Sequence, residues 1–178
     1  MQANSSNEQS KALIEPIDWS QWQPDQHATL LLVIKNNKIL LIEKKRGLGA
    51  GKFNGPGGKL DPGETPLAAA IREVEEELLI TPLEVSFTGE VWFQSIGEFS
   101  FHIHVFRAED YRGEPTETDE AKPLWVPLDE IPYDRMWEDD RFWYPLMIER
   151  IPFVIKTSFL GERMEEFIIE TPDLEEDV

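Results

Sequence analysis

The sequence predicts an α/β domain of the α+β type, with a mixed β-sheet sandwiched between α-helices. Short apolar runs alternate with two helical segments along the 178-residue chain, glycines and prolines mark the turns between them, and 40% of the residues are hydrophobic. A chain of this length can bury one substantial core. We therefore expect a single domain over residues 27–172, a flexible arm at 1–26 in which Trp19 and Trp22 can dock on the domain, and an acidic tail at 173–178.

The domain is predicted to begin with a β-hairpin. Residues 28–34 and 38–43 are apolar runs, and Asn36 and Asn37 between them tolerate the positive φ of a tight turn. A loop with three glycines follows: Gly47, Gly49 and Gly51.

A helix is predicted to start at Pro66, because Thr65 can cap it and proline suits the first helical position. Apolar residues at spacings of three and four form the stripe that we expect to be buried: Leu67, Ala70, Ile71, Val74 and Leu78. At about 100° per residue, Glu73 and Glu77 lie about 40° apart and Glu76 about 60° to the other side of Glu73, so three carboxylates share one arc. A hard divalent cation such as Mg²⁺ would balance them, and the alternative is a solvated acidic face.

The second half of the domain is predicted to add strands and a second helix. Two longer strands follow Pro82, at residues 83–95 and 99–107. His102 and His104 alternate on the second of these strands, and without a third ligand at metal spacing we interpret them as ordinary strand residues. The remaining elements are an acidic loop at 109–121, a strand at 124–126, a helix at 139–150 that contains Pro145, and strands near 152–160 and 163–170.

The net charge of −18 argues against a polynucleotide partner, which requires a basic surface. Seven of the seventeen basic residues nevertheless fall between positions 35 and 59, where Glu43 is the only acid. This local excess would attract a small anion such as a polyphosphate, although the lysines could equally serve to solubilise a hairpin. The chain has no cysteine and no apolar run long enough to span a membrane, so we expect a cytoplasmic protein.

A fixed pattern of glycine, glutamate and arginine runs from Gly55 to Ile80. Its defined positions are Gly58, Glu64, Arg72, Glu73, Val74, Glu76, Glu77 and Ile80. The pattern resembles the Nudix box, G-x5-E-x7-R-E-U-x-E-E-x-G-U, except that Leu79 replaces the glycine that ends the helix, which leaves the geometry of that end open. From about His27 to Glu170 the chain is similar to MutT-type Nudix hydrolases, and most similar to the mammalian hydrolases of oxidised purine nucleoside triphosphates, through three segments at 44–59, 119–132 and 136–146.

The resemblance implies the Nudix fold and a hydrolysis that yields a nucleoside monophosphate and pyrophosphate, with Mg²⁺ as cofactor and Mn²⁺ as a possible substitute. The implied metal ligands are four glutamates and a backbone carbonyl: Glu73, Glu76, Glu77, Glu120 and Gly58. Arg72 would hold Glu64 or Glu73 through a charge-assisted pair. One of Glu73, Glu76 or Glu120 would accept the proton of the attacking water. The implied catalytic residues are therefore Glu73, Glu76 and Arg72.

The resemblance also implies a pocket for the substrate. Its expected residues are Thr29, Lys44, Asn54, Gly57, Lys59, Phe93, Trp137, Asp139, Asp140 and Trp143. An asparagine amide offers both a donor and an acceptor, and aromatic faces stack on a purine. Because two adjacent carboxylates in an apolar pocket do not both ionise, we expect Asp139 or Asp140 to keep a proton and donate a hydrogen bond to the base; the alternative is a helix N-cap pair. Residues Leu48, Phe53, Pro56 and Phe101 differ from that subgroup, which leaves the pocket shape and the preferred base open.

Three functions follow from these observations. The leading one is sanitation of the nucleotide pool, and so avoidance of DNA damage, by hydrolysis of oxidised purine (deoxy)nucleoside triphosphates such as 8-oxo-dGTP or 2-hydroxy-dATP. The second is another Nudix diphosphatase, acting on nucleoside diphosphate sugars or dinucleoside polyphosphates. The third, a Nudix sensor without turnover, is disfavoured because every charged residue of the box is present. We expect a monomer that binds a small nucleotide and has no polynucleotide or membrane partner.

Overall fold

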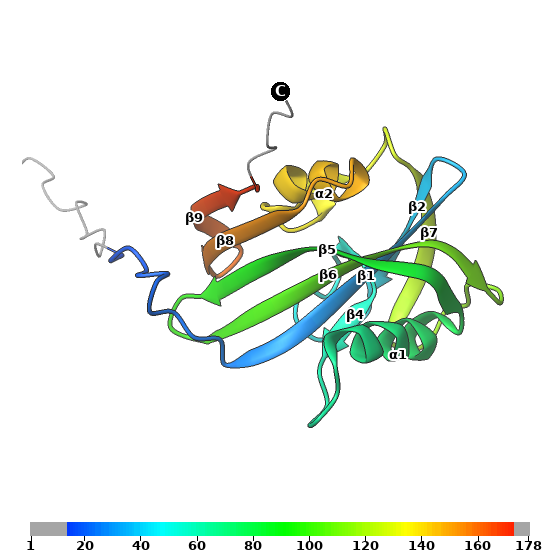
Figure 1. Ribbon diagram of the computed structural model, residues 1–178, viewed down its shortest axis with the longest axis horizontal. Helices are drawn as coiled ribbons and strands as arrows, with labels where there is room; N and C mark the ends of the chain where they lie inside the picture. Colours follow the sequence, from blue (N-terminus) through cyan, green and yellow to red (C-terminus); the bar gives the residue numbers. More distant parts are fainter. Residues whose placement is uncertain (1–13, 173–178) are drawn as a thin grey trace, which may run out of the picture.

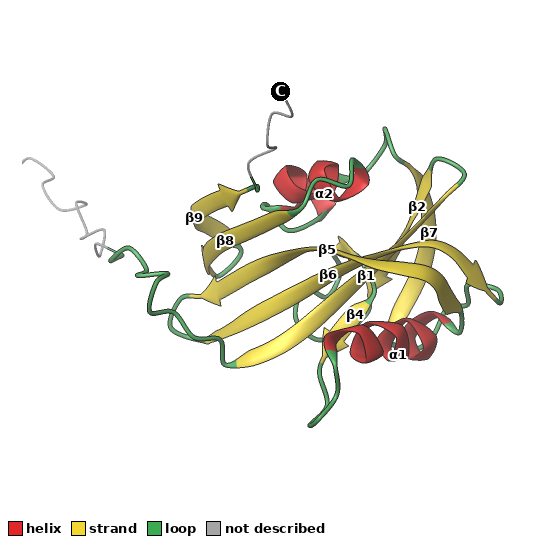
Figure 2. Ribbon diagram, in the orientation of Figure 1, coloured by secondary structure: helices red, strands yellow, loops and turns green. Residues whose placement is uncertain are grey.

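The computed structural model describes residues 14–172 as one large mixed sheet with an α-helix on each face (Figures 1 and 2). The strands are β1 (Gln26–Lys35), β2 (Lys38–Lys44), β3 (Phe53–Asn54), β4 (Gly57–Lys59), β5 (Thr81–Ser95), β6 (Phe99–Arg112), β7 (Ala121–Pro127), β8 (Phe153–Leu160) and β9 (Arg163–Glu170). The helices are α1 (Pro66–Leu78), the 3₁₀ turn η1 (Tyr133–Arg135) and α2 (Asp140–Ile148). The predicted fold class is confirmed.

Two parallel strand pairs join segments that are distant in the sequence. The strand order is β3-β2-β1-β6-β5-β8-β9, with β4 also beside β1 and β7 beside β2. Strands β1 and β6 are parallel, as are β5 and β8, whereas the other pairs are antiparallel. The β1–β6 register places His27 opposite His102. The expectation that His102 and His104 lack a third histidine nearby was therefore wrong, because it considered one strand without its parallel neighbour.

Both faces of the sheet are apolar at its centre, which explains the continuous apolar run of β1. Leu31 and Val33 belong to the core cluster that contains Val74 of α1. Leu32 and Ile34 belong to the opposite cluster, which contains residues of α2. Side chains alternate between the two faces of a strand, so a run without polar residues requires cover on both sides.

Helix α1 begins as predicted but buries a shifted face. The Thr65 side chain accepts a hydrogen bond from the Ala68 N–H at 3.2 Å, which caps the helix. The buried residues are Ala69, Ala70, Val74, Glu77 and Leu78. Leu67 is 43% exposed, contrary to its predicted place in the buried stripe, and Ile71 is only partly buried. The buried face thus includes Glu77 and turns one of the glutamates towards β4.

Several predicted boundaries change because strand pairing continues into polar sequence. Strand β6 extends to Arg112, which pairs with Thr81, so the acidic loop predicted at 109–121 is confined to residues 113–120. The second helix is shorter than the predicted 139–150 and contains Pro145 without ending there. The strands β3 and β4 and the turn η1 were not predicted, because two or three residues carry no recognisable periodicity.

The segment before β1 is attached to the sheet by the two predicted tryptophans. Trp19 is buried and its indole N–H donates to Glu166 Oε1 at 2.9 Å. Trp22 stacks on Trp92 and donates to Gln94 Oε1 at 2.9 Å. The rest of the predicted arm, residues 1–13, and the tail at 173–178 lie outside the described residues, so the division into arm, domain and tail remains a proposal. No helix within residues 14–172 combines the length and the apolar composition that crossing a membrane demands.

Candidate active site

A cavity of about 930 Å³ brings together residues from α1, from the six strands β1 to β6 and from the start of α2. One part of its lining is acidic and comes from α1 and the loop before β7. Another part is aromatic and comes from β5, β6 and the α2 region. The cavity therefore joins a charged region to an apolar region within one continuous volume.

The acidic part depends on the close contact of α1 with β4. The backbone N–H of Gly57 donates to Glu77 Oε2 at 3.3 Å. A Cβ atom at Gly58 would lie 2.4 Å from Cδ of Glu73, and one at Gly57 would lie 1.9 Å from the Thr29 carbonyl oxygen. Glycine is required at both positions, in one case by the Glu73 carboxylate and in the other by the backbone of β1.

Arg72 holds the glutamates of α1 in place. Its guanidinium donates to both carboxylate oxygens of Glu64, at 2.8 and 2.9 Å, and to Glu73 Oε1 at 2.8 Å. The hydrogen bonds that Glu64 accepts from Arg72, and then the one from the Asp61 backbone N–H, lower the pKa of Glu64 to about 2. The expected pairing of Arg72 with Glu64 or Glu73 thus occurs with both. A further bond, of 3.2 Å, goes to Glu76, whose side chain is 58% exposed.

Too little positive charge lies near the carboxylates of Glu73 and Glu77 to offset their burial. Burial raises the pKa of Glu77 to about 8, and the neighbouring Glu73 charge adds to the shift, while the Gly57 N–H and Lys44 oppose it. Burial also raises the pKa of Glu73, against the opposing effect of Arg72. Glu120 lines the same part of the cavity. This set of oxygen donors fits a hard divalent cation, which would supply the missing charge.

Three basic side chains line the cavity near these glutamates: Lys44, Arg46 and Lys59. Arg46 forms an ion pair with Glu120. Burial lowers the pKa of Lys44, and the charges of Glu77 and Glu120 oppose that shift. Basic groups beside oxygen ligands for a cation are suited to bind the phosphates of a nucleotide.

The aromatic part is built on Phe93 of β5. The Phe93 ring packs edge-on against Trp137 at 5.6 Å and stacks on Phe159 at 5.2 Å, both measured between ring centroids. Trp143 is also buried and lines the cavity beside Asp139 and Asp140, where burial raises the pKa of both carboxyls and the Trp143 indole N–H opposes that shift. Flat apolar walls suit a planar heterocycle.

Asp139 and Asp140 are buried where this aromatic part meets α2, with exposed fractions of 3% and 4%. Burial raises the pKa of both carboxyls, and the Asp139 charge adds to the shift of Asp140. The Trp137 backbone N–H donates to Asp140 Oδ2 at 3.1 Å. Asp139 occupies the N-cap position of α2 but makes no capping hydrogen bond with its side chain, so the alternative interpretation as an N-cap pair has no support.

Most of the predicted site residues line this cavity: Thr29, Lys44, Asn54, Gly57, Gly58, Lys59, Glu73, Glu77, Phe93, Glu120, Trp137, Asp139, Asp140 and Trp143. Arg72 and Glu76 do not line it. The prediction missed several lining residues, of which Val91, Phe99 and Ile103 are apolar. Strand alternation could have found them, because residues two apart from Phe93 and Phe101 share their face of the sheet.

Comparisons with known proteins agree with this geometry. The family profile of the NUDIX domain matches residues 25–147. The chain is similar to the oxidized purine nucleoside triphosphate hydrolase of Danio rerio, with 46% identity over 134 residues, covering 75% of this chain and 86% of that protein. It is 40% identical over 126 residues to the Mus musculus protein of the same name, covering 70% and 81%. Among solved structures, a MutT protein from Bacillus halodurans superposes with a TM-score of 0.74 at 22% identity, over 82% of this chain and 97% of that one, which shows a shared fold.

Proposed function

The chain belongs to the NUDIX domain family, and we propose that it hydrolyses oxidised purine nucleoside triphosphates to the nucleoside monophosphate and pyrophosphate. One observation carries the proposal: a single cavity connects the buried glutamates of α1 with Asn54, Asp139 and Asp140. Two relatives that are named hydrolases of such nucleotides, with 46% and 40% identity, support it.

Members of this family require a divalent metal ion, and we propose Mg²⁺, with Mn²⁺ as a substitute. Glu73, Glu77, Glu120 and the Gly58 carbonyl would hold it, because all four residues line the cavity and Glu73 approaches Gly58 closely. Such a cation neutralises charge on the phosphate oxygens and makes the attacking water more acidic. Glu76 is the predicted ligand with the least support, because it is exposed and does not line the cavity.

Other side chains would orient a metal ligand, accept the proton of the attacking water and neutralise the phosphates. Arg72 fixes the orientation of Glu73 through the 2.8 Å hydrogen bond. Glu73 and Glu120, which line the cavity, are better candidates than Glu76 to accept the proton of water as its oxygen attacks phosphorus and the P–O bond between the monophosphate and pyrophosphate groups breaks. Lys44, Arg46 and Lys59 neutralise the phosphates that face them.

The base would be recognised by Asn54 and by the carboxyl pair of Asp139 and Asp140. One carboxyl that keeps its proton donates a hydrogen bond, whereas its ionised neighbour accepts one, so the pair presents both functions to an oxidised purine. An exchange of the proton between the two carboxyls would serve more than one oxidised base. This role predicts that Asp139→Asn and Asp140→Asn change the ratio of kcat/KM between 8-oxo-dGTP and 2-hydroxy-dATP. Unchanged substrate choice and turnover in both variants would contradict the role.

The decisive experiment measures pyrophosphate or phosphate-ester release with Mg²⁺ from dGTP, 8-oxo-dGTP, 2-hydroxy-dATP, ADP-ribose and a diadenosine polyphosphate. We expect selective turnover of an oxidised triphosphate. Glu77→Gln should lower kcat by at least roughly 100-fold, because it removes a buried charge from the metal site. Glu75→Gln is the matched control on the same helix: Glu75 is exposed, does not line the cavity and should leave turnover unchanged.

The other outcomes distinguish the alternatives. Preferred turnover of ADP-ribose or the dinucleotide would retain the glutamate site and reject the proposed base pocket. Absence of turnover with every substrate would favour a sensor. The monomeric state and the cytoplasmic location expected from the sequence remain proposals, to be tested by analytical ultracentrifugation and cell fractionation.

A further inference from the structure

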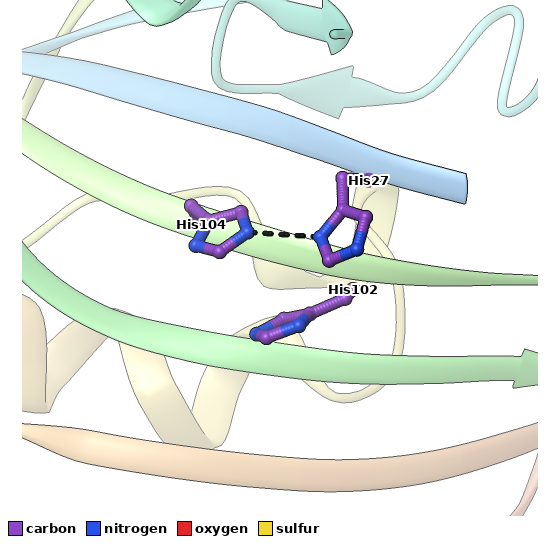
Figure 3. A group of neighbouring side chains, drawn as sticks. All are labelled: His27, His102 and His104. Atoms are coloured by element: carbon purple, nitrogen blue, oxygen red, sulfur yellow. Dashed lines mark hydrogen bonds between the residues drawn. The ribbon is translucent and has the colours of Figure 1, made fainter. Parts of the chain in front are cut away.

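All three histidines of the chain meet at one place on the sheet (Figure 3). His27 comes from β1, and His102 and His104 come from β6. One ligand nitrogen from each ring lies within 4.8 Å of the others, and His27 Nδ1 is 3.2 Å from His104 Nε2. His27 is far in the sequence from His102 and His104, so the parallel pairing of β1 with β6 creates the cluster.

The spacing of these nitrogens suits a transition metal. Tetrahedral Zn²⁺ binds imidazole nitrogen at about 2.0–2.1 Å, which sets neighbouring ligand nitrogens about 3.4 Å apart. The separation of 3.2 Å between His27 and His104 is already close to that value. We propose that His27, His102 and His104 form a binding site for a borderline transition-metal ion of the Zn²⁺ class. The proposal is independent of the nucleotide hydrolysis proposed above.

The surroundings of His102 resemble the outer support of a metal ligand. Glu90 Oε2 is 2.7 Å from His102 Nε2 and also accepts a hydrogen bond from the Trp92 indole N–H at 3.0 Å. A carboxylate on one ring nitrogen of a ligating histidine fixes the ring and makes the other nitrogen more basic. Glu90 therefore acts as a positioning residue that leaves His102 Nδ1 for the ion.

The cluster is open to solvent on one side. His27 is exposed and the other two rings are partly exposed. A cavity of about 300 Å³ lies beside the cluster and is lined by Trp22, Gln23, Pro24, His27, Trp92 and His102. This space admits a metal ion and the water that would complete a coordination shell of four.

The cluster is separate from the acidic site. His27, His102 and His104 alternate along their strands with Ala28, Phe101 and Ile103, which line the large cavity. Side chains that alternate in this way lie on opposite faces of the sheet. The ligand types also differ, because imidazole favours Zn²⁺, Cu²⁺ and Ni²⁺ whereas carboxylate and carbonyl oxygens favour Mg²⁺. A bound ion would tie β1 to β6 behind the substrate cavity.

The test titrates Zn²⁺ into the full chain, which carries no polyhistidine tag, in the presence of saturating Mg²⁺. Binding is followed by calorimetry. Co²⁺, followed by its visible absorption, reports the coordination geometry. We expect one Zn²⁺ per chain and a higher melting temperature on binding. Glu90→Gln should weaken binding roughly 10- to 100-fold, as loss of an outer partner does, and His104→Ala should weaken it further. The matched control is Glu77→Gln, which should bind Zn²⁺ as the unaltered chain does.

The outcomes separate the two sites. Zn²⁺ binding that survives in His104→Ala and is lost in Glu77→Gln would place the ion at the acidic site and overturn the proposal, as would absence of binding at micromolar Zn²⁺. Circular dichroism and metal-free melting verify that each variant folds. If His104→Ala does not fold, His27→Asn serves instead, because His27 is exposed.

Discussion

Asp139 and Asp140 illustrate how burial, rather than residue type, determines the state of a carboxyl group. Both are almost fully buried beside aromatic side chains. Desolvation disfavours the charged form and raises the pKa of each, and ionisation of one opposes ionisation of the other. Two adjacent acids could be recognised from the sequence, but only the packing of α2 places both of them out of water.

The pKa of Asp139 leads to a prediction about stability and pH. Burial raises this pKa from 3.8 to about 7 in the folded state. Because the folded pKa exceeds the unfolded one, the stabilising contribution is fully present below about pH 4 and is lost as the pH rises towards 7. Asp139→Asn should therefore gain stability relative to the unaltered chain as the pH rises. The free energy of unfolding of the variant, minus that of the unaltered chain, should be larger at pH 8 than at pH 5. Urea denaturation at the two pH values measures both free energies of unfolding.

Asp134→Asn is the control for this prediction, because the Asp134 side chain is fully exposed. It should leave the pH dependence of the unaltered chain in place. An equal pH dependence for Asp139→Asn and the unaltered chain would show that Asp139 does not hold the proton.

At the scale of the element, the end of α1 combines a backbone conformation that favours glycine with a leucine side chain. Leu79 occupies the left-handed region, with φ 58° and ψ 32°, and its N–H donates to the Glu75 carbonyl at 3.1 Å. The family pattern has glycine here, and the helix keeps the left-handed ending without it. A residue with a Cβ atom in this conformation costs about 1–2 kcal/mol, which packing of α1 against β1 and β4 offsets.

Replacement of Leu79 by glycine should therefore stabilise the protein. The Leu79 side chain is 58% exposed, so little apolar burial is lost. We expect Leu79→Gly to raise the free energy of unfolding by about 0.5–1 kcal/mol, since relief of the strain exceeds the added flexibility of the unfolded chain. Chemical denaturation provides the measurement. Leu79→Ala keeps the Cβ atom and should give no gain; a gain as large as that of glycine would mean that the side chain, and not the backbone, is responsible.

At the scale of the whole molecule, the segment before β1 connects the far edge of the sheet to its centre. Trp19 hydrogen-bonds to Glu166 on β9, and its ring centroid lies 5.6 Å from that of Trp22. Trp22 in turn stacks on Trp92 of β5 at 5.3 Å. This chain of aromatic contacts runs across the outer strands before the chain enters β1.

Loss of the Trp19 contact should destabilise the fold without affecting the site. Trp19 is 8% exposed. We expect Trp19→Ala to lower the free energy of unfolding by about 3 kcal/mol, as truncation of a buried tryptophan does. Urea denaturation measures this change. The exposed neighbour Gln21 provides the control, and Gln21→Ala should stay within about 0.5 kcal/mol of the unaltered chain. A similar small effect for Trp19→Ala would mean that this segment does not contribute to the stability of the sheet.

Sequence patterns sufficed wherever neighbouring residues define the structure. The Thr65 cap, the glutamates of α1 and the Asn36-Asn37 turn depend on spacings of one to four residues, and each was predicted. Most of the predicted site residues line the cavity, because they were inferred through a resemblance that already contains the folded arrangement. Phe99 was missed although it shares a face of β6 with Phe101, whereas the exposure of Leu67 depends on how α1 is rotated against the sheet.

The sequence by itself determined the helix, its carboxylates and the alternation of each strand, because these follow from periodicities within a single element. The tertiary structure alone decided that His27 meets His102 and His104, and that Glu77 is buried against Gly57. Both results depend on the register of contacts between distant segments. That register minimises the free energy of the whole core, including the close approach that only Gly57 and Gly58 permit, so no local spacing encodes it.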